Sequence, residues 1–327
     1  MASAQRVVSP TVWRSVNWGL GDELLLTSYA GQDILSGNPG HLTLEQSAIL
    51  AQFKEDLGAD GFYDPEKHDD PKLLRFLRAR TFDLQKSKAM WINTFKWRDS
   101  FGVDDLYENF EYPEKAEVNE FCHKVDNVRP PNETPVNVAD FDMPKLLKIT
   151  TPERQLKSLV VELETILRDR FPACSQVAGR RIDTTLTVID VKGVGFNLFW
   201  NSKEVLQKLV MSRLLPNETT TALLKHFYSS VSQDHYPEMV GKVLVINAPY
   251  LFSAIWGVLK RWLSETTVSR IEILGTDYKS TLLQHAPADS LPKFLGGTCA
   301  CPGGCSLSDA GPWEGKVRNF TSKKEIL

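Results

Sequence analysis

One stretch, residues 236–274, constrains the fold of this chain more than any other. Within it, Val243–Ile246 is a continuous run of β-branched residues and leucine that ends at Asn247–Pro249, which indicates a strand covered on both faces. Apolar residues then recur at helical spacing through residues 250–264. Thr267–Leu274 returns to the composition of a strand. A strand, a helix and a strand over about forty residues predict a βαβ unit of a parallel sheet.

The helix of this predicted unit is unusually apolar. Between residues 250 and 259 only Ser253 and Gly257 interrupt the apolar side chains, and the first charge comes at Lys260. A helix that is hydrophobic nearly all round is either buried in a core or in contact with lipid. A membrane span is disfavoured, because the apolar run of residues 243–259 is shorter than the roughly 20 residues that a span needs.

Length, charge and cysteine content set broader limits on the chain. Its 327 residues favour two domains, or one large domain with a small helical partner. A formal charge of −3 gives no electrostatic basis for binding nucleic acid. The first residues lack the apolar region of a secretory signal, and the five cysteines are an odd number in a long chain. We therefore expect a cytoplasmic protein without a disulfide framework.

Three of the cysteines, Cys299, Cys301 and Cys305, stand together in the sequence CACPGGC. A structural zinc site usually has four ligands in paired spacings, and no histidine follows this cluster. The spacing therefore predicts no metal site. It leaves the role of the cluster unassigned.

The order of the expected elements predicts two structural units. Thr43, followed by Gln46, has the pattern of a helix cap, a second helix follows Asp70, and a third covers 84–101. These elements predict a tail at residues 1–40 and a small helical domain at 41–110.

Strands and helices alternate in the remainder of the chain. We expect an amphipathic helix from Glu153 to Arg170 that stops at Phe171-Pro172, a strand over 184–191, and a helix over 282–285. Helices followed by alternating strands and helices favour a helical domain docked on an α/β domain, assigned to residues 111–310, with a tail at 311–327.

The strong signatures of catalysis are missing from the sequence. It has no G-x-S-x-G elbow, no H-E-x-x-H, no P-loop and no G-x-G-x-x-G after a strand. Asp190 ends a predicted strand, where α/β enzymes place carboxylates, but an ion pair with Lys192 explains it equally well. We expect a protein that is not an enzyme and has no cofactor.

Several sequence blocks, in one order, resemble a known family. They are LLRFLRARTFDLQKS, PACSQVAG, TLTVIDVKG, YPEMVGKVLVINAP, TVSRIEILG, LPKFLGG and SLSDAGPW, between residues 73 and 313. Together they resemble the CRAL-TRIO lipid-binding family and are most similar to its fungal phosphatidylinositol transfer proteins. The resemblance implies a helical amino-terminal domain on an α/β domain. A mixed, largely parallel sheet then floors an apolar pocket for one lipid, and a mobile helix gates that pocket.

The resemblance also implies residues for the lipid head group. Matching the family motifs position by position gives Arg80, Thr81, Glu238, Thr267 and Arg270. Arginine can pair with a phosphodiester, threonine can donate a hydrogen bond to it, and glutamate can accept hydrogen bonds from inositol hydroxyls. Thr81 stands where the family usually has lysine, so one positive charge is lost. Without the resemblance these residues are ordinary surface charges.

A second lipid, phosphatidylcholine, has its own implied positions. Thr185 and Thr187 match the hydroxyl pair on the floor strand, and Cys122 and Asn137 fall where the family has two tyrosines that enclose choline. With Cys122 and Asn137 in place of the two tyrosines, the aromatic cage for a quaternary amine is missing. The stretch 207–225 is longer than in typical members, and we assign it no function.

The apolar helix corresponds to the family's gate. A diacyl lipid has on the order of 30 methylenes, and exposing each to water costs ~0.8 kcal/mol. The free-energy cost of releasing the lipid into water is therefore prohibitive. The carrier needs an opening that forms only at a membrane. We expect the gate to present these side chains to the membrane interface: Phe252, Ile255, Trp256, Leu259, Lys260 and Trp262.

The resulting functional hypothesis is binding and intermembrane transfer of phosphatidylinositol, in support of phosphoinositide metabolism and vesicle traffic. We expect a monomer that docks transiently on Golgi, endoplasmic reticulum or endosomal membranes. Two alternatives stay open. One keeps the fold but carries a sterol, haem or another hydrophobic ligand, and the other is a regulatory module that senses lipid.

Overall fold

The computed structural model describes residues 37–115, 117–118, 148–192, 231–250, 252, 256–257, 260, 265–301, 305 and 311–313. Expectations for other positions lie outside the described residues. These include residues 1–36 of the first predicted tail and residues 314–327 of the second. The predicted domain boundaries at residues 40, 110 and 310 stay predictions.

Four helices begin the described chain: α1 (Leu44–Ala59), α2 (Asp70–Ala79), α3 (Leu84–Phe101) and α4 (Val103–Asn109). The first three start at side-chain caps, because Thr43, Asp69 and Asp83 each accept a hydrogen bond from a backbone N–H of the first turn. The predicted capping box of Thr43 and Gln46 is confirmed. The short helix α4 was not predicted.

The first three helices share a core around Trp91. Its ring is fully buried and meets Phe53 and Phe76 edge to face, with ring centroids 6.1 and 4.8 Å away. Its indole nitrogen donates to the Phe62 carbonyl at 2.9 Å, so burial leaves this polar group paired. The aromatic cluster holds the helices together as one packed unit.

A long helical segment follows, composed of α7 (Pro152–Thr165), the π-helix η3 (Ile166–Arg170) and α8 (Phe171–Ala178). The prediction that the helix stops at Phe171-Pro172 was wrong. In the π-turn the Phe171 N–H bonds to the Ile166 carbonyl, and Pro172 falls in the first turn of α8, where its missing N–H is not needed. The helix therefore continues to Gly179, which ends it in the left-handed conformation.

The described strands form one parallel sheet of β1 (Thr185–Asp190), β2 (Val240–Ile246) and β3 (Ile271–Ile273), in the order β1-β2-β3. Val188 pairs with Leu244, and Val243 pairs with Ile271. The predicted α/β class with a parallel sheet is thus confirmed. Leu244 and Ile246 on one face of β2 and Val245 on the other are all buried, as expected for a strand covered on both faces.

The strand predicted for Thr267–Leu274 was wrong in its first half. Residues 265–270 form the short helix α13 (Glu265–Arg270), and β3 begins only at Ile271. Glu265 in the first turn and Arg270 in the last complement the helix dipole, which β propensity alone did not reveal. The expected gate helix at 250–264 lies mostly outside the described residues, although 250, 252 and 256–257 are helical.

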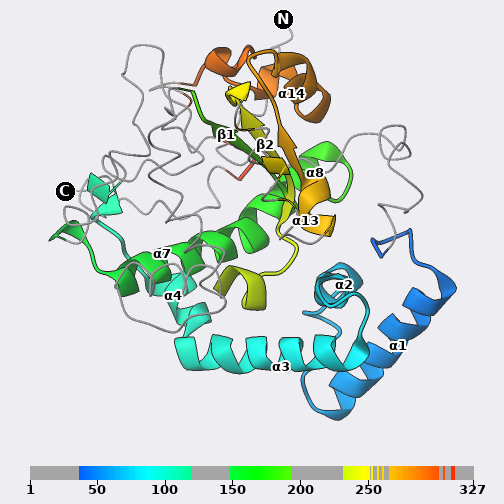
Figure 1. The fold of residues 1–327 in the computed structure, drawn as a ribbon. Coiled ribbons are helices and arrows are strands. Elements are labelled where there is room, and N and C mark those ends of the chain that lie inside the picture. The colour runs from blue at the N-terminus through cyan, green and yellow to red at the C-terminus, as the bar shows by residue number, and fades with distance from the viewer. Residues whose placement is uncertain are drawn as a thin grey trace, which may run out of the picture.

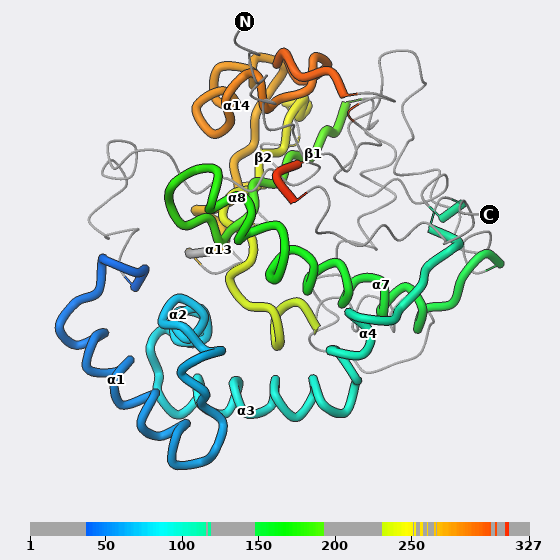
Figure 2. Tube along the Cα trace, turned by 180° about the vertical axis from the view of Figure 1, so that it is seen from behind, coloured from blue at the N-terminus to red at the C-terminus, as the bar shows by residue number. Residues whose placement is uncertain are grey.

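The chain then packs α14 (Lys279–His285) and the 3-10 turns η5 (Ala288–Ser290) and η6 (Lys293–Leu295) against the sheet. In both views the helices α1–α3 lie at one end of the molecule and the strands with α14 at the other, with α7 between them (Figures 1 and 2). Among the described residues, no helix has both the length and the apolar character that a membrane span requires.

Candidate functional site

Two charged residues meet at the amino-terminal edge of the parallel sheet. Glu238 lies two positions before β2 and Arg270 directly precedes β3. Because neighbouring parallel strands run the same way, the residues before them lie at the same sheet edge. The Arg270 guanidinium donates to the Glu238 carboxylate and forms an ion pair with it.

Helix α2 brings two further arginines to Glu238. Arg78 Nε lies 3.7 Å from Glu238 Oε2, and Arg75 Nη1 donates to the Glu238 backbone carbonyl at 3.1 Å. Arg75 also donates to the carbonyl of Asp183, just before β1. Glu238 itself has a φ of 59°, a left-handed conformation that is uncommon for a residue with a side chain. Arg75 therefore fixes the backbone that carries the Glu238 carboxylate.

The site carries a surplus of positive charge. Burial lowers the pKa of Arg75 to about 10 and also lowers that of Arg78, yet both guanidinium groups stay charged at neutral pH. Four guanidinium groups, those of Arg75, Arg78, Arg181 and Arg270, pair with three carboxylates, those of Asp69, Asp183 and Glu238. The sum of +4 and −3 leaves one unit of positive charge, which suits an anionic ligand.

The remaining head-group residues predicted from sequence lie around this centre. Arg80 ends α2, and its guanidinium lies 3.9 Å from the Asp234 carboxylate. Thr81 is exposed in the turn after α2, with a φ of 50°, and Thr267 is exposed on α13. Of the five, Glu238 and Arg270 contact one another directly. The head-group assignment stays a prediction.

The threonines of the floor strand lie on one face of β1, because they are two positions apart. Thr185 is buried and donates from its hydroxyl to the Met239 carbonyl at 3.4 Å, whereas Thr187 is half-buried opposite Val243. Cys122 and Asn137, predicted for the second lipid, lie outside the described residues.

The gate segment is described only in part. Phe252 and Trp256 are half-buried and Lys260 is exposed. Tyr250, where the helical conformation begins, has 95% of its surface exposed. The predicted gate residues Ile255, Leu259 and Trp262 lie outside the described residues. A large aromatic side chain in solvent at the start of this segment provides a group that can enter a membrane interface.

A buried ionic network around Glu164 contacts the segment that leads into Glu238. The carboxylate of Glu164 on α7 accepts hydrogen bonds from Arg98 of α3 at 2.6 and 3.1 Å, from Arg168 at 2.7 Å and from the Tyr236 hydroxyl at 2.7 Å. Burial, followed by the interaction with Glu164, raises the pKa of Tyr236, so its hydroxyl keeps the proton that it donates. Tyr236 lies two positions before Glu238, so the network anchors the chain that enters the site.

Sequence reasoning missed Arg75, Arg78 and Asp183. Arg75 stands between Leu73, Leu74, Phe76 and Leu77, all of which are buried. An arginine inside such a run must be buried with a partner, since an unpaired buried charge is costly. The run LLRFL was enough to predict that Arg75 is buried. It was not enough to predict its partners, which lie more than 100 positions away in the sequence.

Comparisons with known proteins agree with this architecture. The family model for the CRAL/TRIO domain matches residues 129–297, more than half of the chain, and the model for the CRAL/TRIO N-terminal domain matches residues 48–93. The chain is 46% identical over 284 residues to the "Sec14 cytosolic factor" of Schizosaccharomyces pombe, covering 85% of this chain and 91% of that protein.

Two further similarities have lower sequence identity. A protein of Arabidopsis thaliana named "Phosphatidylinositol/phosphatidylcholine transfer protein SFH4" is 36% identical over 276 residues, which are 83% of this chain and 42% of that protein. A solved structure titled "Crystal structure of Sfh5" aligns with a TM-score of 0.43 and 16% identity, covering 73% of this chain and 82% of that one.

Proposed function

The chain belongs to the CRAL/TRIO family, and on this premise we propose that it binds phosphatidylinositol and transfers it between membranes, with phosphatidylcholine as a second lipid. The observation that carries the proposal is the 46% identity to a Sec14 cytosolic factor across most of both chains. The similar plant protein named for phosphatidylinositol and phosphatidylcholine transfer supplies the lipid classes.

The charged centre supports an anionic head group. A phosphodiester carries one negative charge, and the centre at Glu238 has one surplus positive charge, from four guanidinium groups against three carboxylates. Arginine pairs with phosphate through two parallel N–H donors, and a carboxylate accepts hydrogen bonds from inositol hydroxyls. In the proposed complex Arg270 and Arg78 meet the phosphate, and Glu238 accepts from the inositol ring, with Arg80, Thr81 and Thr267 nearby.

Lipid transfer also requires a controlled opening. Each buried CH₂ of an acyl chain is worth ~0.8 kcal/mol, so the bound chains stay enclosed until the protein touches a membrane. We assign the opening to the segment that starts at Tyr250. Its exposed ring, with Phe252 and Trp256, enters the interface, while Lys260 meets anionic lipids.

The same proposal defines how the protein acts. It works without catalysis and without a cofactor, because the phospholipid is a ligand that leaves unchanged. It acts as a monomer in the cytoplasm and docks reversibly on the membranes of the Golgi, endoplasmic reticulum or endosomes. The relatives named as cytosolic factors support the cytoplasmic location.

The test replaces the central ion pair with the double substitution Glu238→Ala and Arg270→Ala. We expect transfer of phosphatidylinositol between donor and acceptor vesicles to be lost, while circular dichroism and the thermal transition show a folded protein. Native mass spectrometry after exposure to lipid should find phosphatidylinositol on the wild type and not on this variant.

The matched control removes a different ion pair that also links β2 to β3. Lys242 Nζ lies 3.0 Å from Glu272 Oε2, and the double substitution Lys242→Ala and Glu272→Ala should leave transfer intact. Undiminished transfer by the Glu238 and Arg270 variant would contradict the site. A folded wild type that takes up no phospholipid from vesicles would contradict the function itself.

A further inference from the structure

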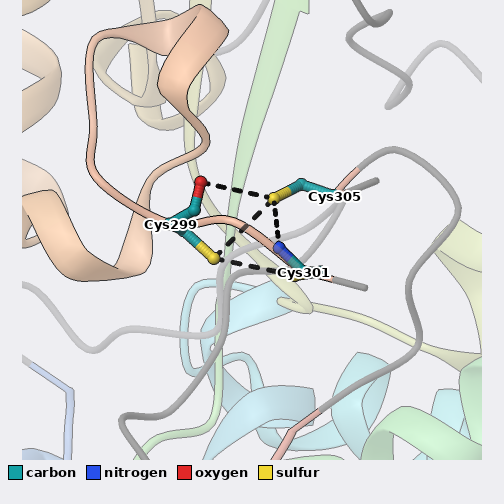
Figure 3. A group of neighbouring side chains, drawn as sticks. All are labelled: Cys299, Cys301 and Cys305. Carbon is teal, nitrogen blue, oxygen red and sulfur yellow. Dashed lines mark hydrogen bonds between the residues drawn. The ribbon is translucent and has the colours of Figure 1, made fainter. Parts of the chain in front are cut away.

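Three thiols converge at one point on the sheet domain, apart from the charged centre. The sulfur atoms of Cys299, Cys301 and Cys305 all lie within 4.8 Å of one another. Cys299 Sγ is 3.6 Å from Cys301 Sγ and 3.7 Å from Cys305 Sγ (Figure 3). None of the three belongs to a disulfide. The sequence gives the order and spacing of the three cysteines along the chain. It does not give the distances between their sulfur atoms, so it did not reveal this triangle.

The separations match those of a metal–thiolate site. Sulfur ligands lie about 2.3 Å from zinc, and tetrahedral angles then place them about 3.8 Å apart. A disulfide bond holds its two sulfurs at about 2.05 Å and has no place for a third thiol. The observed distances of 3.6 and 3.7 Å therefore need little adjustment for a metal ion to sit between the sulfurs.

The surrounding fold builds the site before any ion arrives. The Cys299 N–H donates to the Leu291 carbonyl at 3.0 Å, and the buried Cys299 side chain belongs to the core that contains Leu244. Gly297 permits this close approach, since a Cβ there would lie 1.9 Å from the Leu291 carbonyl oxygen. The Cys301 N–H donates to Cys305 Sγ at 3.4 Å, an interaction that orients a sulfur ligand.

We propose that Cys299, Cys301 and Cys305 bind one soft metal ion, Zn²⁺ or Cu⁺, through their thiolates. Thiolates select these ions over harder cations, and each thiol releases its proton to solvent when it binds. Three thiolates complete a trigonal Cu⁺ site. They fill three of the four positions around Zn²⁺ and leave the last to an external ligand such as water.

The ion would act as a structural clasp. Cys299 is buried in the sheet core, and Cys305 packs against that core at the start of the segment that leads to Trp313. Trp313 is itself buried, with the Arg170 guanidinium of η3 5.5 Å from its ring centroid. Metal binding would fasten the start of this segment to the sheet, and Trp313 fastens its end. This role does not depend on lipid transfer.

The experiment measures metal content in the full-length protein. Protein purified under reducing conditions is stripped with a chelator, incubated with Zn²⁺ or with Cu⁺, desalted and analysed by elemental mass spectrometry. Co²⁺ serves as a spectroscopic probe, because thiolate ligands give it an intense charge-transfer band. We expect one ion per chain for the wild type and a charge-transfer band of thiolate character with Co²⁺.

Cys301→Ser and Cys305→Ser are the test variants, since both side chains are only half-buried. Each should lose the bound ion and the Co²⁺ band. Cys174→Ser is the matched control. Cys174 lies on α8 in a different apolar cluster, and burial raises the pKa of its thiol to about 11, so it should not contribute a ligand.

The outcomes separate cleanly. Loss of the ion in both test variants with retention in the control supports the site. So does a chelator-induced fall in the thermal transition that occurs in the wild type but not in the double variant that combines Cys301→Ser with Cys305→Ser. Unchanged metal content in both test variants, or no ion on the wild type with either metal, overturns it. A disulfide in wild-type protein kept under reducing conditions, detected as the loss of two hydrogens by intact mass, also overturns it.

Discussion

The buried carboxylate of Glu164 on α7 joins α3 to the segment that precedes β2, and its replacement tests how much this connection contributes to stability. We consider Glu164→Gln, which keeps the shape of the side chain and removes its charge. The carboxylate accepts four hydrogen bonds, from Arg98 twice, from Arg168 and from Tyr236. An amide oxygen accepts two, and the amide NH₂ accepts none, so at least two donors are left without an acceptor.

The size of the effect follows from those unpaired donors. Leaving a buried donor unsatisfied costs about 1–3 kcal/mol, and breaking a buried ion pair costs about 3–5 kcal/mol. We therefore expect Glu164→Gln to lower the free energy of unfolding by about 4 kcal/mol at pH 7. Urea unfolding followed by circular dichroism measures this change. The control is Glu153→Gln on the same helix, where an exposed carboxylate pairs with Lys157, and it should change stability little.

The difference between wild type and Glu164→Gln should also depend on pH. Burial alone would raise the pKa of Glu164, but the hydrogen bonds and charges of Arg98, with Tyr236 and Arg168, outweigh it and hold the pKa below its usual 4.5. A carboxylate with a depressed pKa adds stability that is complete above its unfolded value and is lost as the pH falls through the folded value. The difference should be full at pH 7 and shrink below pH 4.5. A loss under 1 kcal/mol at pH 7, or a difference that persists undiminished in acid, would refute this reasoning.

Two further predictions concern packing. Arg75→Ala should lower the free energy of unfolding by about 3 kcal/mol, because two backbone carbonyls lose a buried donor. Arg181→Ala, which removes the ion pairs of an exposed guanidinium with Asp69 and Asp183, should cost about 0–1 kcal/mol. Equal losses in denaturant unfolding would contradict this. Gly297→Ala should lower the thermal transition, because its Cβ would collide with the Leu291 carbonyl, whereas Gly58→Ala, in open space on α1, should stabilise by about 0.5–1 kcal/mol. A fully stable Gly297→Ala protein would show that the turn can relax.

Much of the local structure was predictable because it depends on neighbouring residues. The cap at Thr43 needs only Gln46, three positions away, and the bounds of α3 follow from its apolar spacing and from Gly102 at its end. The strand β2 was predicted from its run of β-branched residues. In each case the deciding interaction lies within one or two turns of the residue.

The errors arose where a distant or unusual interaction decided the outcome. Pro172 normally ends a helix, but the π-turn at 166–170 shifts the hydrogen-bond pattern, so the proline costs nothing there. At 267–270 the threonine and valine content favoured a strand, yet pairing with β2 begins only at Ile271 and the preceding residues form α13. A local change of hydrogen-bond pattern decided the first case, and a helical turn in place of strand pairing decided the second.

The candidate site shows the same limit. The family resemblance pointed to Glu238 and Arg270, and the sheet places them in contact. The two arginines of α2 that complete the charged centre contact residues far along the chain. Periodicity reports which face of a helix is buried, but it does not report what that face meets. The partners of Arg75 and Arg78 could therefore be identified only from the three-dimensional structure.

The parallel pairing of β1 with β2 has a consequence for chain entropy. β1 ends at Asp190 and β2 begins at Val240, so residues 191–239 form one connection between strands that pair along their length. The entropy of closing a flexible connection grows with the logarithm of its length, and each doubling costs only ~0.6 kcal/mol. At this scaling, extra residues in the connection, such as those expected around 207–225, would cost the sheet little stability, so the connection can gain residues without loss of the fold.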